Sequence, residues 1–287
     1  MLAIIEKEFR SFFSSMLGYA IIAFYMIVVG IYFYVANLYL GYSSFETALS
    51  QSIFMFIVLI PVLTMRSLAE ERKNKTDQLL LTSPLSVEKI VVGKYLGVLA
   101  VYMVAILISC VYPFILKSFG DVNMGLTFYS ILGFALMGAA YIAIGVFISS
   151  LTENQVISAV VTFVVVLLTY LMSSLSDLFP SGNLQAWIIF AVLFAILCVV
   201  LYSLTKNIMI TSVVAVIGEA ALAILYFVHK SAYDNTIAGL AKWASISEPY
   251  SYFTQGIVNA GYILYYVSIV VVCLFLTIHS IKKRRWN

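Results

Sequence analysis

Charged residues are scarce in this chain, and their scarcity decides the class of protein. Only 10% of the 287 residues are Asp, Glu, Lys or Arg, whereas 63% are hydrophobic. A soluble domain has about 25% charged and about 45–50% apolar residues, so a soluble globular fold is excluded. The apolar runs are about 20 residues long, which suits membrane helices rather than the strands of a membrane barrel. The composition predicts an all-α polytopic membrane protein.

Residues that support catalysis or metal binding are also few. The three cysteines fall in apolar runs without metal or redox spacing, and the two histidines are isolated: Cys110, Cys198 and Cys273, then His229 and His279. Such cysteines are usually buried as small hydrophobic residues. There is no G-x-x-x-x-G-K-[ST] phosphate loop, because Glu88 stands where Gly93-Lys94 would need the first glycine. We therefore expect no catalytic residue, no metal site, no cofactor and no enzyme activity in this chain.

Eight apolar runs are long enough to cross a bilayer as helices. They occupy residues 18–40, 49–67, 95–116, 127–150, 156–175, 185–205, 208–228 and 262–281. The first run exceeds the apolar core of a signal peptide, so we expect it to remain as a membrane anchor. The fourth run places small residues four apart, which predicts close helix packing: Ala135, Ala139 and Ala143, with Gly138 and Gly145.

Two amphipathic stretches flank these runs. Residues 1–16 carry apolar side chains at steps of three and four, which predicts a helix lying in the membrane interface. Residues 229–261 are more polar, and we expect short outer helices there with aromatic interfacial anchors: Trp243, Tyr250, Tyr252 and Phe253. We expect residues 1–287 to form a single transmembrane domain.

The distribution of basic residues predicts the orientation. With both termini in the cytoplasm, 13 of the 16 Lys and Arg residues face the cytoplasm, and the other three are Lys117, Lys230 and Lys242. Basic residues near span ends concentrate on the cytoplasmic side. We expect a multi-pass protein of the cytoplasmic (inner or plasma) membrane with both termini inside. Residues 65–94, which hold ten of the 29 charged residues, are then cytoplasmic.

The pattern within residues 65–94 predicts two helices. The first runs from residue 68 to residue 81 and is broken by Thr82-Ser83-Pro84. The second begins after Ser86, an N-cap with Glu88 in the first turn, and continues into the third span. The segment could be a solvated loop that only sets topology. Leu79-Leu80-Leu81 argues against this, because three consecutive exposed apolar side chains usually need a partner surface.

The same segment resembles the first cytoplasmic loop of ABC-2-type ABC transporter permeases, particularly their gliding-motility and NosY-like branch. That loop has the form E-[KR]-x-x-G-T-x-E-L-L-x-T-x-P-[ILV]-S, followed by G-K-[YF]. Here residues 71–86 read ERKNKTDQLLLTSPLS and residues 93–95 read GKY, with Lys75 in place of Gly and Gln78 in place of Glu. Further similarity extends the resemblance to residues 1–175 and 236–287. The spans within 185–228 are then an addition to the six helices usual in the family.

This resemblance implies a function and partners. It implies the membrane subunit of an ATP-driven exporter, paired with a second permease, identical or related, and with two ABC ATPases that bind ATP and Mg²⁺. Residues 229–261 could dock an extracellular or membrane accessory subunit, or plug the outer end of the fold. No nucleic-acid partner is expected. The residues implied to couple to the ATPases are Glu71, Arg72, Lys75, Thr76, Asp77, Gln78, Leu79 and Leu80.

Two other functions stay open at this point. A secondary transporter or channel should have inverted repeats and several charged residues at mid-membrane. Only Glu219 lies deep in a predicted span, where it either faces a substrate path or packs between helices. A mechanotransmission subunit, moved by an ATPase but passing no substrate, would use the same coupling loop as an exporter. Nothing in the sequence identifies a substrate.

Overall fold

The computed structural model describes residues 1–76, 85–176 and 236–285, together with Gly182, residues 184–191 and seven single positions: Phe194, Cys198, Ser212, Ala215, Gly218, Glu219 and Tyr226. All regular elements in these ranges are helices. The chain divides into two compact units. Unit 1 comprises Met1–Tyr170 and Ile246–Asn287, and unit 2 comprises Leu171–Ser245.

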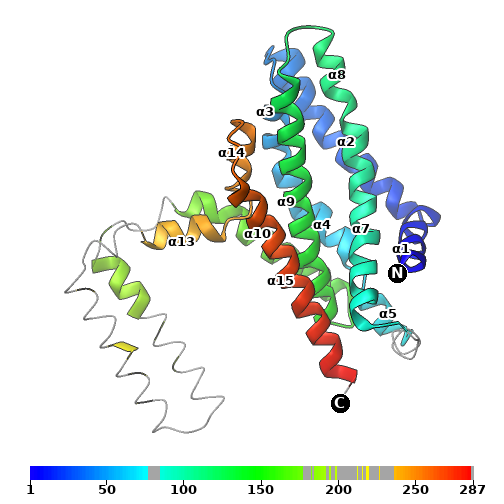
Figure 1. Cartoon of the computed structure of the whole chain (residues 1–287), viewed down its shortest axis with the longest axis vertical. Helices are drawn as coiled ribbons and strands as arrows, with labels where there is room; N and C mark the ends of the chain where they lie inside the picture. Colours follow the sequence, from blue (N-terminus) through cyan, green and yellow to red (C-terminus); the bar gives the residue numbers. More distant parts are fainter. Residues whose placement is uncertain are drawn as a thin grey trace. The chain divides into compact units, whose positions relative to one another are not determined.

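Six helical segments in the described residues are long and apolar enough to cross a membrane (Figure 1). They are Met16–Tyr39, Phe45–Lys73, Val87–Lys117, Met124–Leu151, Gln155–Ser176 and Ala260–Lys283. Five of them contain a predicted span and the first covers residues 18–39 of the span predicted at 18–40, so the protein is a multi-pass, all-helical membrane protein. The spans predicted at 185–205 and 208–228 fall mostly outside the described residues, and the count of eight stays a prediction.

The N-terminal part of unit 1 is an elbow between two helices. Helix α1 (Leu2–Ser14) covers the predicted amphipathic stretch, and its Ile4 and Phe12 are buried. Ser15 then has an extended backbone, with φ −98° and ψ 157°, before α2 (Met16–Phe33) begins. Helix α2 continues as the π-helix η1 (Tyr34–Tyr39), and Gly41 follows in the left-handed region with φ +75°. The elbow separates α1 from the first span.

The second and third spans are both interrupted. The second consists of α3 (Phe45–Ser52), the 3-10 turn η2 (Ile53–Met55), α4 (Phe56–Thr64) and α5 (Ala69–Lys73). The third consists of α7 (Val87–Ser109) and α8 (Val111–Lys117). Pro113 accounts for the break at Cys110, because proline has no N–H to donate to the Ser109 carbonyl and its ring crowds that group. Ser86 is the N-cap of α7 as predicted, but its hydroxyl makes no capping hydrogen bond.

Helix α9 (Met124–Leu151) lies at the centre of unit 1, in contact with α3, α4, α5 and α7. Its glycines allow these neighbours to approach closely. A Cβ added at Gly138 would lie 2.3 Å from the Tyr102 ring of α7, and one at Gly145 would lie 2.3 Å from Thr64 Oγ1 of α4. The two glycines predicted on this helix therefore do serve close helix packing.

The C-terminal half of the described chain includes two long helices and one short helix. The short helix corrects the prediction that its aromatic residues are interfacial anchors. Helices α10 (Gln155–Ser176) and α15 (Ala260–Arg285) are single long spans. The short helix α14 (Tyr250–Thr254) packs against α9 and α3, so Tyr250 and Phe253 are buried rather than being interfacial anchors. The two residues are three apart and share one face of the helix, which is why both turn inward.

Unit 2 holds a separate and smaller apolar cluster. Helix α13 (Thr236–Ala244) contributes Ile237, which is buried together with Ala186 beside Trp187 and Phe190. Trp243 of α13 is exposed, and its interfacial place stays a prediction. Glu219 also belongs to this unit.

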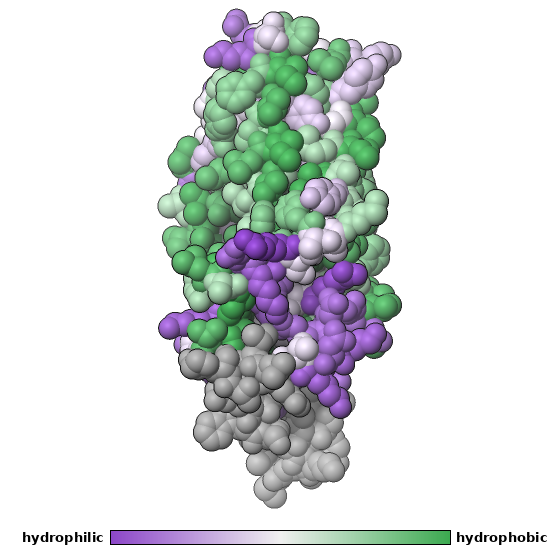
Figure 2. Space-filling view, turned by 90° about the vertical axis from the view of Figure 1, so that its right-hand side faces the viewer, coloured by the Kyte–Doolittle hydropathy of each residue, from purple (hydrophilic) through white to green (hydrophobic). Residues whose placement is uncertain are grey.

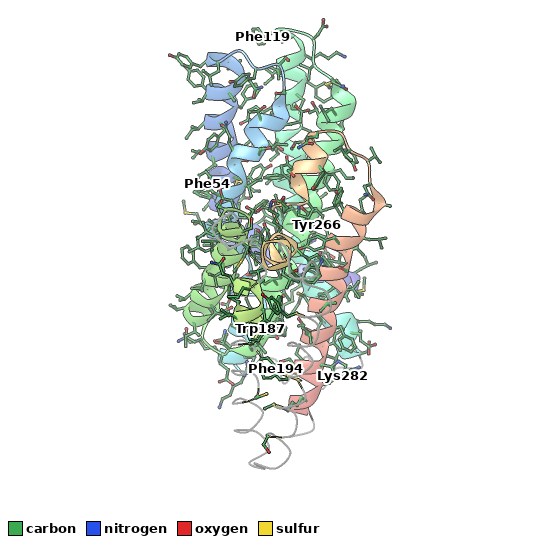
Figure 3. All side chains as sticks on the ribbon, turned by 90° about the vertical axis from the view of Figure 1, so that its left-hand side faces the viewer. Phe54, Phe119, Trp187, Phe194, Tyr266 and Lys282 are labelled. Carbon is green, nitrogen blue, oxygen red and sulfur yellow. The ribbon has the colours of Figure 1, made fainter. Side chains whose placement is uncertain are left out.

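Both termini of the chain approach the same end of unit 1. Glu8 of α1 and Lys282 of α15 each form an ion pair with the first turns of α7. Figure 3 shows Lys282 at this end and Phe119 at the other, with Tyr266 between them. We call the end around Glu8, Glu71 and Lys94 the charged end. In Figure 2, hydrophilic residues gather there over α1 and α5, beneath a largely hydrophobic surface.

Candidate functional site

The segment singled out by the sequence lies at the charged end. Residues 65–76 and 85–94 of it are described, whereas Asp77, Gln78, Leu79 and Leu80, with the predicted break Thr82-Ser83-Pro84, lie outside the described residues. The prediction of one helix from 68 to 81 is wrong, because α5 ends at Lys73.

A specific hydrogen-bond pattern ends α5. The Thr76 N–H donates to the Glu71 carbonyl at 2.9 Å, and the Lys75 N–H donates to the Arg72 carbonyl at 3.1 Å. These two bonds form a Schellman motif, which needs a left-handed residue just after the helix, and Lys75 has φ +57°. The resembled pattern has glycine at this position, and glycine adopts that conformation without steric cost. The backbone at position 75 therefore has the conformation that suits the glycine of the resembled pattern, although the residue here is lysine.

Lys94 is the centre of the site. Its side chain is 1% exposed, although it carries a charge. The ammonium group donates to Glu8 Oε1 at 2.7 Å and to the Ser67 carbonyl at 2.7 Å, and it lies 2.9 Å from Glu71 Oε2. Two of the three N–H donors of the ammonium group therefore make hydrogen bonds, and a second carboxylate lies within ion-pair distance. Lys94 of α7 therefore joins α1, α5 and the turn before α5 in one buried polar cluster.

The charges of this cluster balance. The Glu8 and Glu71 side chains are 12% and 13% exposed, so each carboxylate is largely removed from water. Lys94 supplies one positive charge, and Lys7 supplies a second at 3.4 Å from Glu71 Oε1. Buried charges are tolerated only when they are paired and hydrogen-bonded, as these are. Among the described residues no group of three His, Cys, Asp or Glu is placed to hold a metal ion.

A second set of contacts ties α5 to α9. The Arg72 guanidinium lies 2.7 Å from Glu153 Oε1 and donates to the Ser150 carbonyl at 3.2 Å. The Ser149 hydroxyl accepts hydrogen bonds from the N–H groups of Leu68 and Ala69, at 3.2 and 3.1 Å. The first N–H groups of a helix have no partner within it, so Ser149 acts as a cap supplied by another helix. Both ends of α5 are thereby held by side chains from outside it.

Comparison with known protein families identifies the family of this chain. The family model described as ABC-2 family transporter protein matches residues 35–189, which is more than half of the chain. This chain belongs to the ABC-2 transporter family. No curated protein matches it. Membership of the family makes it a permease component of an ABC transporter, a membrane subunit of a kind that normally lacks ATPase motifs and associates with ABC ATPases. The finer assignment to the gliding-motility branch stays a prediction.

The structure distributes the predicted coupling residues of this ABC-2 permease over two environments. Glu71 and Arg72 are turned into the protein, with side chains that are 13% and 15% exposed. Lys75 and Thr76 are exposed and follow α5 directly. The structure brings Glu71 and Arg72 together with residues that the sequence had not assigned to the site: Glu8, Lys94, Ser149 and Glu153.

Sequence reasoning missed these partners because they are distant along the chain. Lys94 and Glu8 are 86 residues apart, and Arg72 and Glu153 are 81 apart. One local signal was available, since a lysine that directly precedes an apolar span needs a partner when it is buried. The sequence alone does not show which carboxylate meets it.

Glu219 belongs to unit 2, whereas the residues of this site belong to unit 1. It is a half-buried helical residue of unit 2, next to Gly218, which faces the ring of Phe194. Both roles proposed for it, in a pathway or in helix packing, stay predictions.

Proposed function

We propose that this permease is the membrane subunit of an ATP-driven exporter in the cytoplasmic membrane, and that residues 65–94 couple it to its ATPases. In this proposal two permease chains, identical or related, assemble with two ATPase subunits that bind ATP and Mg²⁺. Both termini and the charged end face the cytoplasm. Thirteen of the 16 basic residues lie on that side in this orientation.

The observation that carries the proposal is the way α5 is held. Glu71 links it to α1 and α7 through Lys94, and Arg72 links it to α9 through the Ser150 carbonyl and to the turn after α9 through Glu153. The Lys94 contacts are short, charged and largely shielded from water, so they resist stretching more than an exposed pair does, whereas Arg72 meets a carboxylate that is 71% exposed. A force applied to α5 is therefore passed to three other helices of unit 1. A loop that only set the topology would not need such connections.

The candidate residues then divide into two roles. We assign contact with the ATPase to Lys75, Thr76, Asp77, Gln78, Leu79 and Leu80. Glu71 and Arg72 are assigned to transmission, because their side chains are already bonded within the permease. The apolar leucines are the natural anchors of a contact, since apolar anchors in a pocket dominate interface energies.

The test compares one variant of each role, with the ABC ATPase that assembles with this permease as the partner. A contact variant, T76A/D77A/L79A, should lose at least about tenfold in co-purification with the ATPase, because three interface side chains are removed. A transmission variant, R72Q, should retain co-purification but lose permease-dependent stimulation of ATP hydrolysis. R10Q is the matched control, since Arg10 is an exposed arginine of α1 paired only with Glu6.

The two readouts separate the possible failures. Unchanged co-purification and unchanged ATP hydrolysis in the contact variant would remove residues 75–80 from the interface. Loss of co-purification in R72Q would show that Arg72 itself belongs to the contact rather than to transmission.

A further inference from the structure

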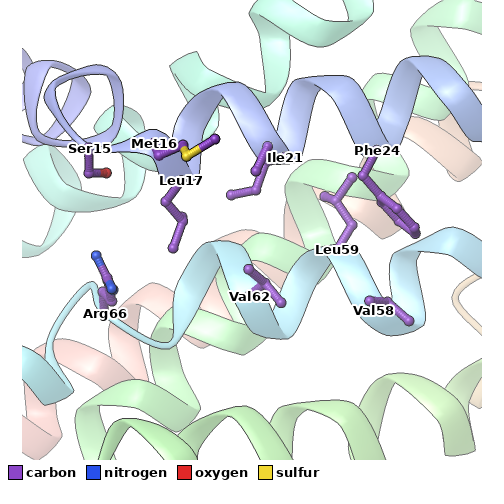
Figure 4. A pocket seen from close by; sticks show the side chains of 10 residues that line it. Ser15, Met16, Leu17, Ile21, Phe24, Val58, Leu59, Val62 and Arg66 are labelled. Atoms are coloured by element: carbon purple, nitrogen blue, oxygen red, sulfur yellow. The ribbon is translucent and has the colours of Figure 1, made fainter.

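An apolar groove opens between α2 and α4 in unit 1. Its volume is about 500 Å³, within the range of ligand-binding clefts. Figure 4 shows Leu17, Ile21, Phe24 and Val62 lining it from the two helices, with Arg66 at one end. Ser15 of the elbow and Arg66 are the polar residues of the lining. The groove is thus shaped as an apolar channel that ends at a single guanidinium group.

A second cavity of about 250 Å³ shares Ser15 and Arg66 with the groove. This cavity is polar, because its lining includes three basic and three acidic side chains: Lys7, Arg66, Lys94, Glu8, Glu70 and Glu71. Ser67 also lines it, is 2% exposed, and has a hydroxyl without a hydrogen-bond partner in the part of the chain that the structure describes. A buried hydroxyl without a protein partner is costly, so this hydroxyl is available for a hydrogen bond to a ligand.

The charges of the polar cavity are not equally available. Lys94, Glu8 and Glu71 satisfy one another, and Lys7 adds to the same cluster. Arg66 and Glu70 form a looser pair, because their charged atoms are 4.0 Å apart and their side chains are 42% and 41% exposed. One guanidinium and one carboxylate, side by side, are therefore open to a ligand that carries both charges.

We propose that the two cavities together bind a phospholipid with an unmethylated ammonium headgroup. One acyl chain lies in the α2–α4 groove, the phosphate contacts Arg66 and Ser67, and the ammonium donates to Glu70. Arginine is suited to phosphate because its planar N–H groups match the phosphate oxygens. A bilayer is already apolar, so the groove positions the chain while the headgroup contacts provide the selectivity.

The polar cavity also favours a lipid over a helix from a second copy of the chain. An apolar helix in the groove would leave the Arg66 guanidinium beside hydrocarbon, which is costly for a charge. It would also leave the Ser67 hydroxyl without a partner. A phospholipid has an acyl chain that suits the apolar groove and a charged headgroup that suits the adjoining polar cavity.

Native mass spectrometry of the purified full-length chain in detergent tests this proposal, with phosphatidylethanolamine as the probe. A20F should fill the groove, since Ala20 lines it and is exposed, and R66Q should remove the phosphate contact. Each should lower lipid retention by about tenfold, the effect of losing one strong contact. The matched controls I27F, on the exposed surface of α2, and R10Q, on α1, should retain lipid as the unaltered chain does.

Two further arms identify the ligand. Phosphatidylcholine, whose ammonium has no N–H, and glycerophosphoethanolamine, which has no acyl chains, should both bind at least about tenfold more weakly than phosphatidylethanolamine. A phosphatidylethanolamine with a photoreactive acyl chain should label peptides of α2 and α4 in the unaltered chain, which needs no variant to fold.

The proposal would be overturned by equal lipid retention in A20F, R66Q and their controls, or by labelling confined to other helices. Equal binding of phosphatidylcholine would overturn the role of Glu70. If A20F changes the oligomeric state while lipid retention stays the same, the groove is an interface between copies and holds no lipid.

Discussion

At the charged end of unit 1, Lys94 joins α1, α5 and α7 through ion pairs, whereas no ion pair is described at the opposite end, where hydrogen bonds and aromatic packing make the contacts. There the Thr127 hydroxyl of α9 donates to Glu46 Oε1 of α3 at 2.6 Å, and Phe253 of α14 stacks on Tyr129 with ring centroids 4.8 Å apart. Burial raises the pKa of the Tyr250 hydroxyl well above its ordinary value, and the nearby Glu46 carboxylate adds to this rise. Tyr250 therefore remains a neutral packing residue.

This difference determines how much stability each end loses when one contact is removed. Removing one member of a buried ion cluster leaves the opposite charge without compensation, so the cost exceeds the value of the lost contact. Removing a neutral contact costs about what that contact contributes. The charged end therefore acts as a set whose members depend on one another, and the opposite end acts as a sum of separate contacts.

The largest effect is expected for Lys94→Met. It leaves Glu8 and Glu71 without their ammonium partner and should lower the free energy of unfolding by about 3–5 kcal/mol. The free energy is measured by chemical denaturation in micelles. The triple variant K94M/E8Q/E71Q should recover most of the loss, because a neutral set of similar volume often replaces a buried ion cluster without penalty. K282M, which alters an exposed pair, is the control, and no recovery in the triple variant would contradict the ionic explanation.

A smaller loss is expected at the opposite end for Gly133→Ala. The added Cβ would lie 2.5 Å from Cγ of the buried Phe253, so α14 must shift. Overpacking of this kind costs about 1–3 kcal/mol in the free energy of unfolding. G125A on the same helix is the control, since its Cβ would meet only the Asn123 side chain at 3.5 Å. The loss from G133A should be the same at low and high salt. A salt-dependent loss would mean that charges contribute to packing at this end also.

A gain of about 1 kcal/mol is expected for Lys75→Gly, because the left-handed conformation is costly for any residue with a Cβ. The neighbouring K73G replaces a helical residue of α5 and should instead lose about 1 kcal/mol. Denaturation of the two variants under identical conditions checks the opposite signs. A loss in both would show that Lys75 contributes a contact that outweighs its backbone cost.

The smallest effect is expected for Glu46→Gln. The amide oxygen can still accept the hydrogen bond from Thr127, so the free energy of unfolding should change by less than about 1 kcal/mol. Comparing the change in the free energy of unfolding for Glu46→Gln with that for Lys94→Met tests whether removing a buried charge costs more at one end of unit 1 than at the other. A loss as large as that of Lys94→Met would mean that Glu46 is part of an ionic set.

The spans and several boundaries could be predicted from the sequence because they depend on neighbouring residues. Apolar runs gave six of the helical segments, and Ser86 marked the start of α7. The end of α5 was missed, since lysine rarely adopts a positive φ and nothing local requires it at Lys75. The aromatic residues of α14 were misjudged because tyrosine and phenylalanine suit both a membrane interface and a core.

The sequence predicted where the candidate site lies but not which contacts its residues make. The charge pattern located residues 65–94, and the resemblance singled out Glu71 and Arg72. That these two residues face Lys94 and Glu153 depends on how α7 and α9 pack against α5. A single sequence contains no local signal for that packing.

The cap that Ser149 provides for α5 also has a consequence for biosynthesis. Leu68 and Ala69 leave the ribosome 81 and 80 residues before the hydroxyl that accepts their N–H groups. Isolated short helices are marginal in water, and α5 has only five residues. We therefore expect the residues of α5 to remain without stable helical structure until the fourth span has entered the membrane. The surface assigned to the ATPases is completed only after the spans that it will move are in place.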